Sequence, residues 1–302
     1  MVEERLKKMS EEKQIFVIDS SQLNDWDLCH YKFYLKYIIE NGMGLHPIQR
    51  EHSLDIGTVV HELLRVYYFL KRNGGIEHDK IVSSCIKRGR IFVSQSSDLS
   101  AEDIEFILYL FKEYCSYYEN EQWIPLDIEL PFVEKAFEDE NYLFLVQGRI
   151  DLVVKIPSQP DPVIVDHKTR SRIKEESKLD NQKIIYSKFL GINTFLVNKF
   201  GLLKTKSNKE RFQRDPVSYT EDYIEEWYDE FVMTLKEIIA YRKINFYKRE
   251  PTSCDKWAGC TFKQWCNSDR MKRKSLINMT YKIGEEKWDV GKTLEKRKEL
   301  VK

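Results

Sequence analysis

Two aspartates and a lysine lie on two predicted strands that a short loop joins. Asp151 belongs to an apolar run over residues 142–156, and Asp166 and Lys168 end a second run over residues 163–168. The loop between them contains three prolines, which is typical of a turn. If the hairpin is symmetric about this loop, Asp151 lies opposite Asp166, with Lys168 on the same face as Asp166. A slip of one residue would send one aspartate to the other face.

These three side chains could hold a metal ion. Two carboxylates held close together repel each other and lose hydration, which is costly unless a cation lies between them. Their hard oxygen ligands select Mg2+ or Mn2+, and a nearby lysine can hold an anion or orient a water. Metal, water and lysine together suit hydrolysis of a phosphodiester. The alternative is that these residues form a charged strand end facing solvent. The D-x-K tripeptide taken alone favours this alternative, because such tripeptides are common.

Other polar side chains fall on predicted elements near this hairpin. A helix over residues 179–189 places Gln182 and Tyr186 on one face, because they are four residues apart. A helix over residues 57–71 carries His61 in its first turns, where a lone histidine is usually structural or exposed. The pattern of apolar residues makes both helices amphipathic.

A strand over residues 126–137 is the predicted first strand of the sheet. It contains Pro131, which indicates an edge position or a bulge because proline cannot donate a backbone hydrogen bond. Glu129 precedes it in an E-x-P-F pattern. We interpret Glu129 as an exposed strand glutamate, with membership of the site as the alternative.

Four short motifs follow one another in the order of a known superfamily. They are GTVVH at 57–61, GRID at 148–151, VDHKT at 165–169 and QKIIY at 182–186. Together they resemble the RecB-type exonuclease branch of the PD-(D/E)xK nuclease superfamily. The segment over 21–38 resembles the serine-led opening helix of that branch, with His30 where a proline is usual. The resemblance covers about residues 20–266.

The resemblance implies a role for each motif residue. It implies that the metal ligands are Asp151, Asp166, His61 and the backbone carbonyl of His167. It also implies that Lys168 is the catalytic lysine and that Gln182 and Tyr186 position the DNA strand. The second acidic position is Asp166 where many members have Glu, and the family accepts both.

Three of the six cysteines fall close together, as Cys254-x5-Cys260-x5-Cys266. Thiolates gathered this closely usually bind Zn2+ or an iron–sulfur cluster, and Cys29 can supply a fourth ligand. The spacing disfavours zinc, whose ligands are typically two to four residues apart. Unligated surface thiols are the remaining alternative. The resemblance implies a structural [4Fe–4S] cluster held by these four cysteines, although the family's usual C-x2-C step is C-x5-C in this chain.

Local basic segments are the candidates for contacts with nucleic acid. The whole chain of 302 residues is neutral, with 49 basic and 49 acidic residues, so its net charge gives no support for such contacts. A stretch just after the D-x-K motif could contact phosphates or form a solvated loop. It consists of Arg170, Arg172 and Lys174. A second stretch has one acid and is predicted as a phosphate-contact patch. Its basic residues are Lys199, Lys204, Lys206, Lys209, Arg211 and Arg214.

Composition predicts an intracellular protein with reduced thiols. The start of the chain is charged and has no apolar run of the signal-peptide kind, and no apolar stretch approaches the length of a membrane span. Six cysteines in a chain of this length do not suggest a disulfide scaffold.

The predicted fold class is α/β: a restriction-endonuclease-like core with a mixed sheet flanked by helices. We predict an extension over 1–19, a single nuclease domain over 20–270 and a basic tail over 271–302. Within the domain, residues 20–125 would be helical, residues 126–215 would form the catalytic core, and residues 216–270 would hold a long helix and the cysteine lobe.

The resemblance implies a metal-dependent DNA exonuclease that prefers single strands or ends and works in recombination, repair, or CRISPR or phage DNA processing. The chain has no G-x-x-x-x-G-K-[ST] loop, so opening a duplex would need a helicase or another partner protein. One alternative is a non-catalytic DNA-binding scaffold subunit with the same fold. The other is a structure-specific or RNA-directed endonuclease.

Overall fold

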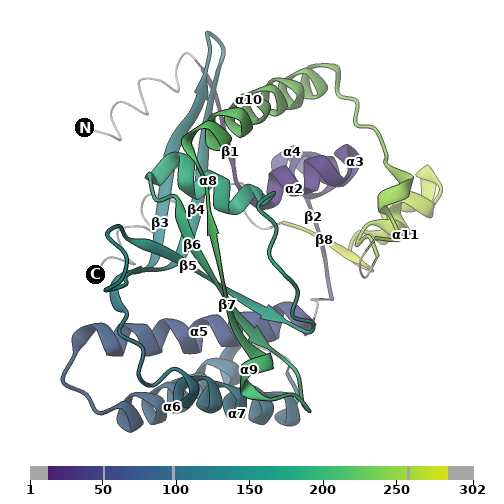
Figure 1. Ribbon diagram of the computed structural model, residues 1–302. Helices are drawn as coiled ribbons and strands as arrows, with labels where there is room; N and C mark the ends of the chain where they lie inside the picture. The colour runs from purple at the N-terminus through teal and green to yellow at the C-terminus, as the bar shows by residue number, and fades with distance from the viewer. Residues whose placement is uncertain (1–12, 50–51, 97–98, 257–258, 285–302) are drawn as a thin grey trace. The chain divides into compact units, whose positions relative to one another are not determined.

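The computed structural model describes residues 13–49, 52–96, 99–256 and 259–284 and has a mixed α/β fold, as predicted (Figure 1). The chain forms two compact units. The first unit comprises Met1–Gln49, Phe132–Gly148 and Glu225–Lys302, and the second comprises Arg50–Pro131 and Arg149–Ile224. The predicted domain boundaries stay a prediction, and residues 285–302 of the predicted basic tail lie outside the described residues.

The sheet is mixed, with the strand order β1-β4-β5-β6-β7 and β3 paired to β4. β4 pairs antiparallel with β5, β5 pairs parallel with β6, and β6 pairs antiparallel with β7. The parallel β5–β6 pair requires a crossover, and helix α8 lies in that connection. The bounds are β1 Gln14–Ile18, β3 Ile124–Glu138, β4 Tyr142–Lys155, β5 Val163–Arg170, β6 Thr194–Gly201, β7 Phe212–Ser218 and α8 Asn181–Leu190.

The predicted hairpin register is confirmed. Leu152 pairs with Val165 and Val154 pairs with Val163, which is the symmetric arrangement about the proline loop. Alternate positions of both strands are buried against the helices of the second unit. The intervening residues Val153 and Ile164 are also buried, at 4% and 1% exposed, so both faces of this pair are covered.

Three long helices of the second unit lie side by side: α5 His52–Asn73, α6 His78–Ser96 and α7 Ala101–Tyr117 (Figure 1). Their apolar faces form one core with residues of β4 to β7. Gly89 lets α6 approach α5 closely, since a Cβ there would lie 2.6 Å from Leu63 Cδ2. Cys85 and Cys115 are buried in this core. The short helix α9 Asn208–Arg211 precedes β7.

The first unit contains a second small core near the cysteines. Leu35, Leu45, Phe262, Trp265 and Tyr281 pack together there, so segments from both ends of the chain share one cluster. β2 Leu45–Pro47 also pairs with β8 Tyr281–Ile283. The helices are α2 Ser20–Leu28, α3 His30–Phe33, η1 Tyr34–Ile38, α4 Ile39–Gly42, η2 Pro251–Ser253, α11 Lys263–Asn267, η3 Arg270–Lys272 and α12 Arg273–Leu276. The long helix α10 Glu221–Ile244 begins in the second unit and continues through the first.

Two sequence predictions about the early chain are wrong. The first strand is β1, which pairs parallel with the start of β4, and not β3. The opening helix ends at Leu28 instead of continuing to residue 38, and Asp19 caps its start. The Asp19 carboxylate accepts from the backbone N–H of Gln22, whose side chain accepts from the Asp19 N–H at 3.1 Å. This reciprocal pair is a capping box, and a carboxylate serves it as well as a hydroxyl does.

Candidate active site

Asp151 is held from two sides. Its Oδ2 accepts a hydrogen bond of 2.8 Å from the backbone N–H of His167, and its Oδ1 lies 3.5 Å from His61 Nδ1. Burial alone would raise the pKa of Asp151, but the hydrogen bond and charge of His61 and the His167 amide outweigh it, so the pKa lies below its ordinary value. The carboxylate therefore stays ionised in a site shielded from water.

A chain of hydrogen bonds runs from the second aspartate to the backbone of β4. Lys168 Nζ lies 2.9 Å from Asp166 Oδ1 and donates to Gln182 Oε1 at 2.9 Å. Gln182 Nε2 donates to Tyr186 Oη at 3.1 Å, and that hydroxyl donates to the Arg149 carbonyl at 3.0 Å. The structure thus brings Lys168, Gln182 and Tyr186 together, and their hydrogen bonds fix the direction of the Lys168 ammonium.

Helix α8 presents this chain because its start is firmly capped. The Asp180 carboxylate accepts from the backbone N–H of Gln182 and of Lys183, which satisfies two amides of the first turn. Gly191 closes the other end in the left-handed conformation, with φ of 68°. The spacing of four residues then places Gln182 and Tyr186 on the face toward β4 and β5.

Asp166 has a ligand position to spare. Its side chain is 4% exposed, and its Oδ2 is buried without a hydrogen-bond partner in the part of the chain that the structure describes. Burial raises the pKa of Asp166 above its ordinary value; the Lys168 ammonium opposes this shift and the Asp151 charge adds to it. An orphaned buried carboxylate oxygen is costly, and a cation bound there would remove the cost. The residues present therefore fit a divalent metal.

Glu129 corrects a sequence interpretation. Its side chain is 13% exposed rather than solvent-facing, and ligand atoms of Glu129, His61 and Asp151 all lie within 4.8 Å of one another. Arg149 Nε holds its Oε2 at 2.8 Å. Glu129 has φ of 52°, which is the kind of irregularity that Pro131 predicted in an edge strand. The E-x-P-F pattern was the signal that could have identified it.

We expect Glu129→Gln to weaken Mn2+ binding at least tenfold, since even residues that only support a metal ligand contribute that much. The amide keeps an acceptor for Arg149 but loses the charge that attracts the cation. Titration of Mn2+ by calorimetry measures the effect directly. Glu134→Gln, at an exposed position of the same strand, is the matched control. Equal affinities in the two variants would remove Glu129 from the metal site.

His167 enters the site through its backbone, while its ring belongs to a buried network. The ring stacks on Tyr68 at 5.7 Å, and its Nδ1 lies 2.8 Å from Asn198 Nδ2. Arg214 Nε donates to Asn198 Oδ1 at 3.2 Å. Arginine can only donate, so the Asn198 amide group must face His167, whose Nδ1 therefore accepts. Burial lowers the pKa of His167 to about 3, in agreement with a neutral ring. That its carbonyl binds metal stays a prediction.

Half of the predicted phosphate-contact patch is wrong. Lys199 is 1% exposed, and its ammonium is bound to Asp215 and to the Lys174 carbonyl. Arg211 is buried and donates to the carbonyls of Leu203 and Lys204 at 2.7 and 2.8 Å. Arg214 lies over two aromatic rings. These three cations satisfy internal acceptors because they lie on the buried parts of β6, α9 and β7, which a count of charges does not reveal.

The four predicted cluster cysteines line one cavity of the first unit. The cavity has a volume of about 170 Å³, and Cys29, Cys254, Cys260 and Cys266 all face it. Lys32 and Arg249 are on its wall. Burial raises the pKa of the Cys260 and Cys266 thiols, with the charges of Lys32 and Arg249 respectively acting in the opposite direction. No disulfide joins the cysteines of the described chain. Trp257, a predicted aromatic neighbour, lies outside the described residues.

A mixed sheet that gathers two carboxylates and a lysine defines a protein of the restriction-endonuclease-like class. A comparison with protein families matches residues 20–267 to the PD-(D/E)XK nuclease superfamily. The chain therefore belongs to the PD-(D/E)XK nuclease superfamily, whose members generally use divalent metal ions and whose fold implies DNA as the substrate.

Two solved structures are similar to this chain at low identity. One is described as a "Putative exonuclease" from Eubacterium rectale; it is 13% identical, with a TM-score of 0.44, and the match covers 77% of this chain and 84% of that one. The other is SSO0001, also 13% identical, with a TM-score of 0.27 and coverage of 61% and 78%. Among curated proteins nothing matches the chain. No helix in the described part of the chain is long and apolar enough to span a membrane.

Proposed function

We propose that this protein is a metal-dependent DNA exonuclease that hydrolyses phosphodiester bonds at single strands or strand ends. The observation that carries the proposal is the convergence of ligand atoms of His61, Glu129 and Asp151 within 4.8 Å. The same hairpin carries Asp166, whose Oδ2 has no hydrogen-bond partner among the described residues. The exonuclease type rests on the resemblance of the GTVVH and QKIIY motifs to the RecB-type branch.

Asp151 and Asp166 would hold Mg2+ or Mn2+, with His61 and Glu129 as further ligands and the His167 carbonyl as the predicted last one. A bound metal of this kind supplies Lewis acidity at the phosphate oxygen. Asp151 is suited to this role because its pKa lies below the ordinary value, so that it remains a charged ligand at neutral pH. Asp166 presents its free oxygen on the same side of the hairpin.

Lys168 acts as a fixed cation. Burial opposes its charge, but the Asp166 carboxylate outweighs burial and raises the pKa of Lys168 above its ordinary value. A protonated lysine cannot take a proton from water; it donates N–H to the oxygen of the attacking water and to the negative charge that develops on the phosphate. Gln182 and Tyr186 keep the ammonium in place and position the strand.

The cysteine cavity supports the second part of the proposal, a structural [4Fe–4S] cluster. Cys29, Cys254, Cys260 and Cys266 line one cavity, so their thiolates can converge on a shared metal group. Lys32 and Arg249 would offset the negative charge of four thiolates. Zinc is the alternative. The cluster would join Cys29, near the start of the chain, to the three cysteines near its end.

The proposal is tested on anaerobically purified protein. We expect end-labelled linear single-stranded DNA to be degraded with Mn2+ and to remain intact after chelation of the metal, while a circular single strand survives. Cutting of the circle would favour the endonuclease alternative. Binding of DNA without cleavage of any DNA or RNA substrate would favour the scaffold subunit. A helicase, or another recombination, repair or CRISPR protein, remains the proposed partner for work on a duplex.

The cluster has its own measurement. We expect brown protein with about four irons per chain, and loss of the visible absorption in Cys260→Ser. Colourless protein that contains zinc and still cuts DNA would retain the nuclease and replace the cluster by zinc.

A further inference from the structure

The loop over residues 171–180 joins the two elements that carry the candidate active site. It follows β5, which holds Asp166 and Lys168, and precedes α8, which holds Gln182 and Tyr186. The loop therefore connects directly to both elements that would surround a phosphate bound at Lys168. The proposed function assigns no role to the loop, although its first residues include the basic Arg172 and Lys174.

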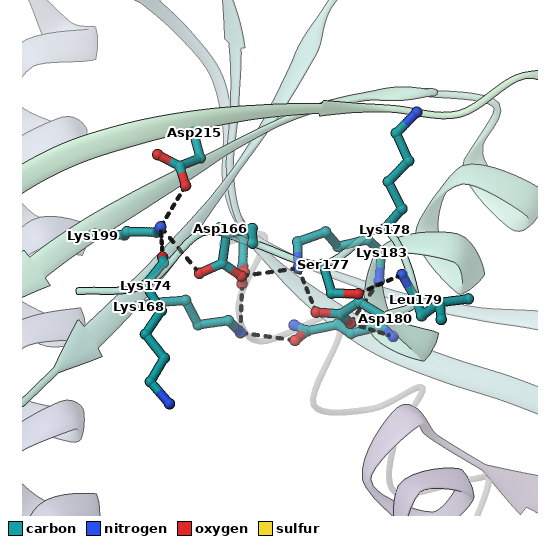
Figure 2. A network of polar contacts seen from close by, with 12 residues as sticks. Asp166, Lys168, Lys174, Ser177, Lys178, Leu179, Asp180, Lys183, Lys199 and Asp215 are labelled. Carbon is teal, nitrogen blue, oxygen red and sulfur yellow. Dashed lines mark hydrogen bonds and ion pairs between the residues drawn. The ribbon is translucent and has the colours of Figure 1, made fainter. Parts of the chain in front are cut away.

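Buried lysines and a tyrosine hydroxyl anchor the loop at every second residue from 174 to 178. The Lys174 carbonyl accepts from the fully buried Lys199 ammonium, and the Lys178 carbonyl accepts from Tyr219 Oη at 2.9 Å. Between them, the Glu176 carboxylate is 9% exposed and lies 3.6 Å from both the Lys183 and the Lys199 ammonium. Figure 2 shows this network around the two buried lysines. A backbone held at three points is fixed before any ligand binds.

The same anchors separate the charges of the loop. Its sequence contains three basic and three acidic residues, so it is neutral in composition. However, Glu176 and Asp180 turn inward to Lys183 and Lys199, whereas the side chains of Arg172, Lys174 and Lys178 are exposed. Only Glu175 is an exposed acid there. The outer surface of the loop thus has three cations against one anion, for a net charge of +2.

An apolar side chain stands among these cations. Leu179 is 83% exposed, yet its backbone is fixed because its N–H donates to Ser177 Oγ at 3.0 Å and Asp180 next to it caps α8. Figure 2 shows Lys174 and Lys178 leaving the network in different directions, with Leu179 beside the start of the helix. A cationic surface with one rigidly presented apolar residue suits a nucleic acid strand, which offers phosphates and base faces together.

We propose that the loop over residues 171–180 is a preorganised strand-binding surface, in which Arg172, Lys174 and Lys178 contact phosphates and Leu179 contacts a base. This inference rests on the proposed function, because it places the substrate strand beside Lys168. Rigid anchoring lowers the conformational entropy lost on binding. Buried Lys183 and Lys199 act at a distance from the strand, by holding the loop that touches it.

The test is the salt dependence of binding to a fluorescein-labelled single-stranded oligonucleotide in the presence of chelator, followed by fluorescence anisotropy. Each lost phosphate contact reduces the slope of log K against log salt by about 0.7 for a single strand. We expect Lys174→Ala/Lys178→Ala to reduce the slope by about 1.4. Lys80→Ala/Lys135→Ala, at two exposed lysines paired with Glu77 and Glu138, is the matched control and keeps the slope of the wild type.

Leu179 gives a separate readout. We expect Leu179→Ala to weaken binding severalfold with an unchanged slope, and Leu179→Met to restore most of the affinity, because an apolar contact releases no counterions. If the wild type cuts DNA but the double lysine variant keeps its slope, the loop is not the strand-binding surface and the proposed function stands. If the wild type neither binds nor cuts nucleic acid, the proposed function and the loop assignment both fail.

Discussion

Lys168→Ala is expected to lower the rate of DNA cleavage by about a hundredfold to a thousandfold, which is the usual loss when one group that stabilises charge in the transition state is removed. The alanine variant loses the ammonium that forms an ion pair of 2.9 Å with Asp166. Because the role proposed for Lys168 is to donate to the phosphate rather than to bind the metal, affinity for Mn2+ should change much less than kcat. Single-turnover cleavage of a labelled strand measures the chemical step.

Two matched variants separate a catalytic role from a structural one. Lys155→Ala removes an exposed lysine from the other strand of the same hairpin and should leave cleavage unchanged. Gln182→Ala keeps the ammonium but removes the acceptor that orients it, so its loss of rate should be smaller than that of Lys168→Ala. If Lys168→Ala retained the wild-type rate while Asp166→Asn abolished cleavage, the lysine would have no role in the chemistry.

The sequence was sufficient for those site residues that share one local pattern. The symmetric hairpin predicted the register of β4 and β5, because a short loop between adjacent antiparallel strands fixes which residues lie opposite each other. The spacing within QKIIY predicted that Gln182 and Tyr186 lie on one helix face, and they do. In both cases the arrangement depends on residues close in the chain, where strand and helix periods determine which side chains face each other.

The residues that sequence reasoning missed depend on contacts between distant segments. Glu129 reads as an exposed strand residue until the fold brings His61 and Asp151 to it. Lys199 belongs to a basic run in the sequence, but β6 directs it inward to Asp215 and to the loop over 171–180. Charge patterns report composition; only the packing of the sheet decides which charges are buried and paired.

Arg214 joins several buried groups, so its loss should destabilise the fold. Its guanidinium carbon lies 3.4 Å from the ring centre of Tyr118 and 3.7 Å from that of Trp123. It also pairs with the Glu121 carboxylate, whose side chain is 5% exposed, and donates to Asn198. A single arginine thus connects two aromatic rings, a buried acid and the amide that orients His167.

We expect Arg214→Ala to lower the free energy of unfolding by about 2–3 kcal/mol, because the variant loses a buried charged hydrogen bond and its ring contacts, while Glu121 keeps the Lys71 ammonium at 3.0 Å. Arg214→Lys should lose less, since it keeps the charge but not the planar stacking or the several donors. Urea denaturation measures both.

Arg88→Ala is the control: Arg88 is 59% exposed and lies 3.8 Å from Glu62, so its loss should cost under about 1 kcal/mol. Equal stability of the Arg214→Ala and Arg88→Ala variants would show that the aromatic pair and Glu121 contribute nothing through Arg214. We also expect Lys168→Ala to unfold at the same free energy as the wild type. A loss of stability in Arg214→Ala alone would show that Arg214 supports the fold, whereas Lys168 does not.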